Sequence, residues 1–177
     1  MSVSGVSEIV GLEFEDPAGE RLRFEWLADQ LAIYEPDPNA EQPIWRLGGE
    51  LDWDEIEVVR VISARLGDGR LLAVVGLRPP EAPGHDAELV VGAIGTTESF
   101  AQMHETLLST EYDADGQPRR IGLELYASED AIPLRVAGEA TAHGSFDNGG
   151  VRRTCAALRV RAAGTAGVGA FDVVRAE

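Results

Sequence analysis

The sequence contains no lysine, and all 15 of its basic residues are arginines. Without a side-chain amine, the chain cannot form a lysine Schiff base with pyridoxal phosphate or a carbonyl substrate, and it has no P-loop lysine. Cys155 is the only cysteine, which excludes an intramolecular disulfide and a cysteine zinc cluster. A lone cysteine fits a reducing compartment, so we expect a cytoplasmic protein.

Targeting segments and metal motifs are also missing from the sequence. Residues 1–11 lack a basic region followed by a long apolar one, and no stretch approaches about 18 uninterrupted apolar residues. The three histidines, His85, His104 and His143, have no short metal-ligand spacing, and no Ser-His-Asp or Cys-His pattern can be assembled. We therefore expect no metal, no cofactor and no membrane span.

Basic charge is scarce, since 31 acidic residues outnumber the arginines and give a formal charge of −16. This charge repels the phosphate backbone of nucleic acid and the surface of an anionic membrane, so neither is an expected partner. The 44% hydrophobic content over 177 residues is ordinary for a globular protein. We expect one domain over residues 1–177, and the sequence leaves a homodimer open.

Apolar and polar residues alternate with period two in many short runs, which is typical of half-buried β-strands. Turn residues separate the runs, as at Ala18-Gly19, Gly67–Arg70 and Asp113–Gly116, where glycine supplies the positive φ of a tight hairpin. No βαβ rhythm or internal repeat is present. Strands are expected at residues 10–14, 22–26, 31–34, 45–53, 58–66, 71–77, 89–94, 106–112, 119–126, 132–140, 151–160 and 168–174.

Several segments between the expected strands have other sequence signatures. Residues 78–86 are rich in proline and predict a surface loop, and residues 143–150 predict a turn. Glu98–Leu108 fits a helix behind a Ser99 N-cap, but it also alternates as a strand, which we favour because its surroundings are β. The glycines from Gly164 to Gly169 lack the context of a phosphate loop and indicate close approach of a neighbouring strand.

This pattern predicts an all-β fold, namely a single antiparallel meander barrel of about eight to ten strands. Barrel closure removes the exposed sheet edges that would otherwise promote aggregation. A β-sandwich is the alternative architecture.

Chemistry could be carried by carboxyl, histidine and tyrosine groups. Asp52 and Glu124 are interleaved with apolar residues, and a carboxyl group facing an apolar interior would have a raised pKa and could donate a proton. His104 shares parity with apolar neighbours in the strand interpretation, and Tyr126 could supply a hydrogen bond. The alternative is that both carboxylates lie on solvent faces and that His104 is an ordinary exposed or satisfied residue.

Aromatic residues on amphipathic strands are candidates for lining a ligand cavity. Trp26, Trp45, Trp53 and Tyr112 combine a large apolar body with a polar tip. Packing in the core is the alternative role for each of them. Barrels of this kind keep small-molecule cavities in their interior.

Two stretches resemble a known group of proteins. Residues 110–126, from Thr110-Glu111-Tyr112 through Tyr126, and the closing Gly167-Val168-Gly169-Ala170-Phe171-Asp172 look like the later strands of lipocalin-like proteins related to carotenoid 1,2-hydratases. The resemblance covers about the last 75 residues. It implies an antiparallel barrel with an apolar cavity, in a group that binds or transforms hydrophobic molecules, some by acid-assisted addition of water to an alkene.

The resemblance departs from the group in two respects. Those proteins commonly pair two barrels, whereas this chain has room for one, and no catalytic residue of the group matches a position here. We therefore expect a lipocalin-like barrel that binds a small apolar or amphipathic molecule in its interior. The alternatives are a cofactor-independent hydratase, isomerase or cyclase that uses Asp52, His104, Glu124 and Tyr126, and a protein-interaction module with a packed core.

Overall fold

The computed structural model describes residues 12–15, 21–27, 30–34, 56–82, 87–96, 100–148 and 151–176. All regular structure in these ranges is β-strand, which confirms the predicted all-β class. They contain no helix of the length and apolarity that a membrane crossing requires. The expected strand at 45–53 lies outside the described residues.

A small antiparallel sheet is formed near the start of the chain by β1 (Leu12–Glu15), β2 (Arg21–Leu27) and β3 (Gln30–Tyr34). Leu12 pairs with Phe24, as the first predicted hairpin requires, and Phe24 also pairs with Ile33. Alternating apolar and charged residues in β2 are what a strand with two different faces needs.

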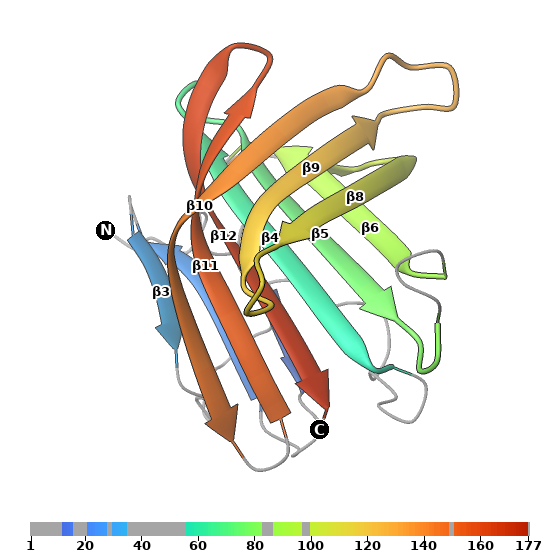
Figure 1. The fold of residues 1–177 in the computed structure, drawn as a ribbon. Helices are drawn as coiled ribbons and strands as arrows, with labels where there is room; N and C mark the ends of the chain where they lie inside the picture. Colours follow the sequence, from blue (N-terminus) through green and yellow to red (C-terminus); the bar gives the residue numbers. More distant parts are fainter. Residues whose placement is uncertain are drawn as a thin grey trace.

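The main sheet has nine strands in the order β7-β6-β5-β4-β12-β11-β10-β9-β8. Figure 1 shows it curling strongly, with β8 and β9 turned over the inner face of β4 and β5. Its strands are β4 (Val58–Leu66), β5 (Leu71–Arg78), β6 (Leu89–Gly95), β7 (Phe100–Gln102), β8 (Glu105–Tyr112), β9 (Pro118–Tyr126), β10 (Leu134–Asn148), β11 (Val151–Ala162) and β12 (Thr165–Ala176).

The order of the strands is that of a meander whose first strand, β4, pairs with its last strand, β12. Every neighbouring pair in the sheet is antiparallel, so the two outer strands of this odd-numbered sheet, β7 and β8, run in the same direction. They are also consecutive in the chain. Together they are one strand, interrupted at Met103 and His104, that pairs first with β6 and then with β9.

The interruption joins the two edges of the curled sheet. The amide of Met103 donates to the carbonyl of Gly92 at 2.8 Å, and the amide of His104 donates to the carbonyl of Tyr126 at the same distance. The prediction of a strand over Glu98–Leu108 is therefore confirmed where the segment is described, although the break was not predicted. The barrel prediction is confirmed as a curled, barrel-like sheet of nine strands.

One turn was predicted wrongly. Residues 143–148 continue β10 in register with β11, from His143 opposite Ala156 to Asn148 opposite Val151. A shift in register between Ala140 and Ala142 lets the long strand bend. Glycine and asparagine in this stretch suggested a turn, but the ladder with β11 decides the local structure.

The core lies on the concave face of the main sheet. Ile62 and Phe171, which are opposite each other in β4 and β12, are fully buried there. The convex face of the central strands is buried as well, as Val59 and Val61 show, in agreement with their nearly continuous apolar sequence. Gly169 permits the close approach of β12 to β4, because a Cβ atom there would lie 2.9 Å from the carbonyl oxygen of Ser63.

A buried arginine bridges the seam between β6 and β8, where the described residues form no strand ladder beyond the Met103 to Gly92 bond. Arg60 Nε donates to Glu88 Oε1 at 2.6 Å, and Nη2 donates to Glu88 Oε2. Arg60 Nη1 donates to Thr110 Oγ1 at 2.6 Å. Since Glu88 directly precedes β6 and Thr110 lies in β8, one guanidinium ties both edges together.

Gly76 leaves the space through which the Glu88 side chain reaches Arg60. Gly76 lies opposite Arg60 in the register of β4 and β5, so the Glu88 side chain must cross β5 at that point. A Cβ atom at Gly76 would lie 2.9 Å from the carboxyl carbon of Glu88. The side chains of Arg60 and Glu88 are only 0% and 1% exposed.

We expect Glu88→Gln to lower the free energy of unfolding by about 3–5 kcal/mol, because it leaves the Arg60 charge buried without a counter-charge. Urea denaturation measures the loss. Asp68→Asn is the control and should cost far less, since the Arg70–Asp68 pair is 31% and 39% exposed. A double Arg60→Met, Glu88→Met variant should recover most of the loss. Equal losses in Glu88→Gln and Asp68→Asn would contradict this account.

Candidate functional site

Polar side chains occupy one end of the concave face, where β12 and β8 end and β11 begins. Thr154 lies opposite Val173, and Arg152 lies opposite Arg175, so these four side chains share the concave face with the buried Phe171. Farther along the same face, the side chains are apolar and belong to the buried core. The interior is thus divided into an apolar half and a polar half.

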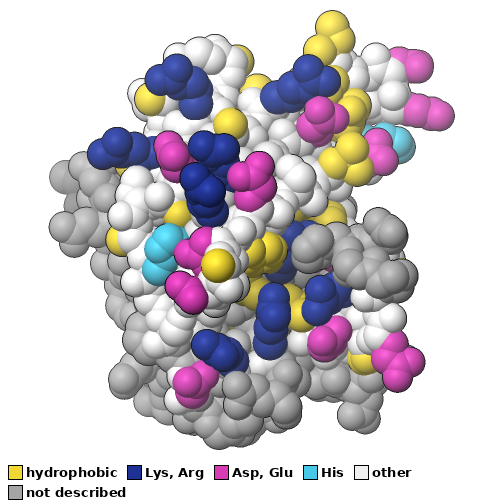
Figure 2. All heavy atoms as spheres, viewed as in Figure 1, with side chains coloured by type: hydrophobic (Ala, Val, Ile, Leu, Met, Phe, Trp, Pro, Cys, Tyr) yellow, Lys and Arg dark blue, Asp and Glu magenta, His cyan; other side chains and the backbone are white. Residues whose placement is uncertain are grey.

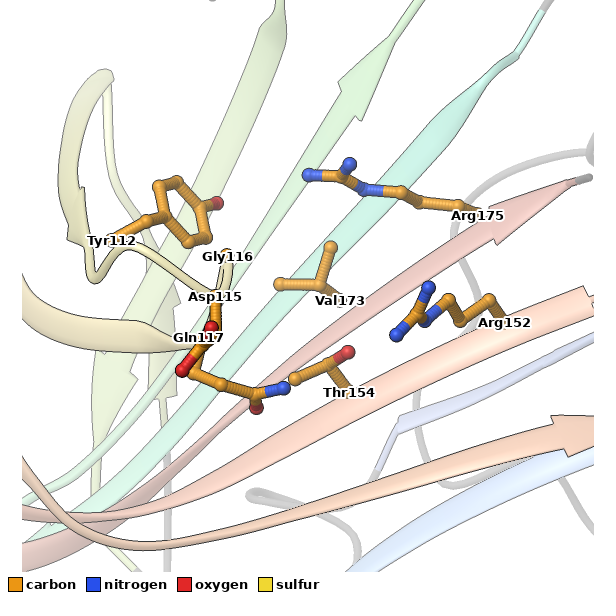
Figure 3. Close-up of a pocket in the computed structure, with 8 residues that line it drawn as sticks. All are labelled: Tyr112, Asp115, Gly116, Gln117, Arg152, Thr154, Val173 and Arg175. Carbon is orange, nitrogen blue, oxygen red and sulfur yellow. The ribbon is translucent and has the colours of Figure 1, made fainter.

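The polar half contains a pocket of about 120 Å³, which we call the arginine pocket. Figure 3 shows the guanidinium ends of Arg152 and Arg175 directed toward the side of the pocket where Tyr112 and Gln117 lie. In Figure 2, basic side chains gather around a hollow over the lower parts of β11 and β12. The residues that line the pocket are Tyr112, Asp115, Gly116, Gln117, Arg152, Thr154, Val173 and Arg175.

A tight turn between β8 and β9 positions one wall of the pocket. Asp113 Oδ1 accepts hydrogen bonds from the amides of Asp115 at 3.0 Å and Gln117 at 2.9 Å. Gly116 takes a positive φ of 76°, which a residue with a side chain rarely adopts. This turn was predicted from the Asp-Ala-Asp-Gly sequence, and it holds Gln117 over the end of the barrel.

Two polar atoms of the pocket are buried and lack a partner among the described residues. They are the Tyr112 hydroxyl and Gln117 Oε1. A buried polar atom without a hydrogen bond costs about 1–3 kcal/mol, so such atoms need a reason. The other end of the Gln117 amide is fixed, because Nε2 donates to Ser145 Oγ at 3.4 Å. A donor and an acceptor therefore remain available at the pocket.

Tyr112 is the one predicted ligand-binding residue whose side chain the structure places at a pocket. The side chains of Trp26, Trp45 and Trp53 lie outside the described residues, as does Asp52. The predicted role of Tyr112 stays a prediction, since its position is shown and a ligand is not.

Of the two interpretations of His104, inward-facing or exposed, the structure agrees with the exposed one. Its side chain is exposed, while Thr106, which was assigned the same parity, is buried. The alternation fails because the strand is interrupted at Met103 and His104, where the backbone changes partners from β6 to β9. His104 therefore has no access to the arginine pocket.

Glu124 and Tyr126 do lie together, but on the outer face of β9. The Tyr126 hydroxyl donates to Glu124 Oε2 at 2.8 Å, and Arg135 Nε donates to Glu124 Oε1 at 2.9 Å. These hydrogen bonds, of which the one from Tyr126 has the larger effect, hold the pKa of Glu124 below its ordinary value. The same bond raises the pKa of Tyr126. A raised carboxyl pKa would have required Glu124 to face an apolar interior, and the solvent-face interpretation holds instead.

The outer face of β8 to β11 carries an open groove of about 640 Å³. Glu124 and Arg135 stand on its rim as a pair, and Leu107, which is 47% exposed, adds apolar surface. No group of three or more His, Cys, Asp or Glu side chains that could hold a metal occurs in the described part of the chain.

The sequence analysis did not identify Arg60 of the seam or the two arginines of the pocket, Arg152 and Arg175. Arg60 stands between Val59 and Val61 in a nearly continuous apolar run, and an arginine in such a run is a signal of a buried, paired charge. Arg152 and Arg175 gave no such signal. The two arginines are neighbours because of the register between β11 and β12. Alternation within one strand does not predict which residues of two strands lie opposite each other.

A second buried charge pair lies on the opposite face of β11 and β12. Arg153 Nε donates to Asp172 Oδ1 at 2.8 Å, and the two side chains are 9% and 2% exposed. Burial raises the pKa of Asp172 to about 6, although the Arg153 charge and hydrogen bond act to lower it. Cys155 is buried beside them, as predicted for a small core residue, and burial raises the pKa of its thiol.

Asp172 predicts a specific pH dependence of stability. Its pKa in the folded protein, about 6, lies above the ordinary 3.8, so the folded state holds a proton that the unfolded chain releases between these values. The stabilisation is complete below about pH 4 and is lost as the pH rises through 6. We expect the free energy of unfolding, taken relative to Asp172→Asn, to fall by roughly 2 kcal/mol between pH 4 and pH 6.5.

The control for this measurement is Asp68→Asn. Hydrogen bonding from Arg70 lowers the pKa of Asp68, so its contribution is lost only as the pH falls below about 4, and its difference curve should be nearly flat between pH 4 and pH 6.5. Urea denaturation of all three proteins across this pH range gives both difference curves. A flat curve for Asp172→Asn would contradict the burial account.

Comparisons with known proteins give no family assignment. No protein-family model matches the chain, and no curated protein matches it in sequence. Among solved structures, it is similar to CghA with Sch210972 at 12% identity and a TM-score of 0.48, covering 89% of this chain and 51% of that one. A second CghA structure gives 12% and 0.49 over the same shares.

Kievitone hydratase from Nectria haematococca is similar at 8% identity and a TM-score of 0.48, covering 95% of this chain and 56% of that one. This chain thus spans about half the length of these proteins. Similarity at this level carries no argument about activity, and the fold rests on the strand pairing described above.

Proposed function

We propose that this barrel binds a small amphipathic molecule in the arginine pocket. The observation that carries the proposal is the pair of buried, unpartnered polar atoms there, the Tyr112 hydroxyl and Gln117 Oε1. A bound polar group would satisfy both at once. The hydroxyl of Thr154 and the side chain of Val173 complete a surface that is polar around the rim and apolar at its centre.

The polar pocket favours an amphipathic ligand over a purely apolar one. In the apolar half of the interior, side chains such as Ile62, Phe171 and Val74 are fully buried against one another. A hydrocarbon in the arginine pocket would leave the polar atoms unsatisfied and would desolvate two guanidinium groups. The ligand therefore presents polar atoms to the pocket and rests an apolar portion on Val173.

The enzyme alternative receives less support from the described residues. Acid-assisted catalysis needs its proton donor and hydrogen-bond partner at one substrate atom. Glu124 and Tyr126 instead bond to each other on the outer face, and His104 is exposed at the break in the strand. Of that predicted set, no described member lines the arginine pocket.

Tyr112→Phe tests the proposal, because it removes the hydroxyl and keeps the ring. We expect it to weaken ligand binding roughly tenfold, while the free energy of unfolding stays equal or rises, since a buried unpartnered group is lost. Titration calorimetry with hexanoate, hexanol and hexanamide measures binding, and urea denaturation measures stability. Ser109→Ala removes an exposed hydroxyl of β8 that donates to the Gly122 carbonyl at 3.3 Å, so it should leave binding unchanged and lower the free energy of unfolding only slightly.

Saturable binding of at least one of these probes is required. If no probe binds, or if one binds with the same affinity to Tyr112→Phe, the arginine pocket is not the binding site.

A further inference from the structure

Two positive charges stand directly opposite each other in the arginine pocket. Arg152 and Arg175 are paired in the register of β11 and β12, and both side chains line the pocket. Like charges directly opposite on one face of an antiparallel pair repel each other and destabilise the sheet. Both side chains are exposed, so water weakens this repulsion, as it weakens the attraction between Arg152 and Asp147, but two positive charges remain together at the pocket.

Buried and half-buried arginines elsewhere in the barrel have carboxylate partners. Arg60 is paired with Glu88, and Arg78 Nη2 lies 3.2 Å from a Glu57 carboxylate oxygen. The sequence has 31 acidic residues for 15 arginines, so partners are plentiful. Among the described strand pairings, no other arginine lies directly opposite an arginine, so the opposed pair is an exception in that respect.

The carboxylates near the pocket do not cancel this charge. Arg152 Nε lies 3.9 Å from Asp147 Oδ1, and these side chains are 53% and 71% exposed, so water screens the contact. Asp115 lines the pocket but forms no ion pair with either arginine among the described contacts. Within the part of the chain that the structure describes, Arg175 has no carboxylate partner.

We infer that the arginine pocket recognises an oxyanion, a carboxylate or a phosphate ester, which Arg152 and Arg175 share. This inference rests on the proposed binding function and names the polar end of the ligand. Guanidinium groups donate planar, charge-assisted hydrogen bonds that match such oxygens. The Tyr112 hydroxyl donates a further hydrogen bond, and the anion removes the repulsion between the two arginines. Gln117 Oε1 only accepts, so the Gln117 amide must turn over to present Nε2 to the anion, with Oε1 accepting from the Ser145 hydroxyl in place of the long 3.4 Å contact.

The inference predicts opposite effects of one substitution on stability and on binding. Arg175→Gln removes the repulsion, so it should raise the Tm by roughly 1–4 °C at low salt, and this gain should shrink in 0.5 M NaCl. The same substitution, and Arg152→Gln, should weaken oxyanion binding tenfold or more. A residue with a purely structural role would not gain stability when it is replaced.

Arg161→Gln is the matched control. Arg161 lies in β11, the strand of Arg152, and is exposed on the other face of the sheet. Its partners in β10 and β12 are Ala137 and Ala166. The change in net charge is identical, but no opposed arginine is involved. Its Tm and its binding should equal those of the unmodified protein.

The binding experiment compares hexanoate, hexyl phosphate, inorganic phosphate and the neutral hexanamide by titration calorimetry on the full chain. The inference expects the organic anions to bind at least tenfold more tightly than hexanamide, and the Arg→Gln variants to lose this preference. The tighter of hexanoate and hexyl phosphate identifies the carboxylate or the phosphate ester as the recognised group. Inorganic phosphate, which lacks an apolar portion, should bind more weakly than hexyl phosphate.

Hexanamide that binds as well as hexanoate, with affinities unchanged in Arg175→Gln but weakened in Tyr112→Phe, would overturn the oxyanion inference and leave the proposed function standing. An unchanged or lower Tm in Arg175→Gln at low salt would overturn the charge argument by itself. The absence of binding by any probe would overturn both the inference and the proposed function.

Discussion

The bridge from Arg60 to Glu88 and Thr110 is the interaction on which the shape of the barrel depends. Backbone hydrogen bonds hold each strand of the main sheet to its neighbours, but between β6 and β8 the described ladder is missing. The seam is spanned there by one buried guanidinium with hydrogen bonds to both sides. A curled sheet without such a bridge would present two open edges, which attract other strands.

The bridge also determines the site. Thr110 and Tyr112 lie two residues apart in β8, so the hydrogen bond to Thr110 holds the strand close to the residue that lines the pocket. On the other side, Arg60 lies opposite Val173, which forms the apolar centre of the pocket. A buried ion pair is a weak source of net stability, because desolvation offsets most of the attraction. Its contribution here is geometric, since it places β8 against the end of the barrel where β11 and β12 present their arginines.

Much of the fold could be predicted from the sequence, because alternation and turn chemistry are local. The strand at 58–66 and the hairpin around Gly67–Arg70 agree with the structure residue by residue. The break at His104 could not be predicted, since it arises from a change of partner strand. Glycine and asparagine made residues 143–148 resemble a turn, whereas pairing with β11 extends β10 through them.

The site was less predictable than the fold. Tyr112 was a candidate because an aromatic residue on an amphipathic strand is visible in the sequence, and its side chain lines the arginine pocket. Arginines in alternating strands look like solvent-facing residues, so the opposition of Arg152 and Arg175, 23 positions apart in the sequence, needed the register of two strands. The sequence also left open whether Glu124 faces the interior or solvent. Alternation shows which residues of a strand share a face, but it does not show which face is buried.

The most direct test of the seam is amide hydrogen exchange in the Arg60→Met, Glu88→Met variant, compared with the unmodified protein at matched global stability. The account predicts faster exchange at Met103, His104 and the β8 amides, with protection unchanged in β11 and β12, because only the bridge between the sheet edges is lost. Equal protection at Met103 and His104 in both proteins would show that the charge network does not hold the seam.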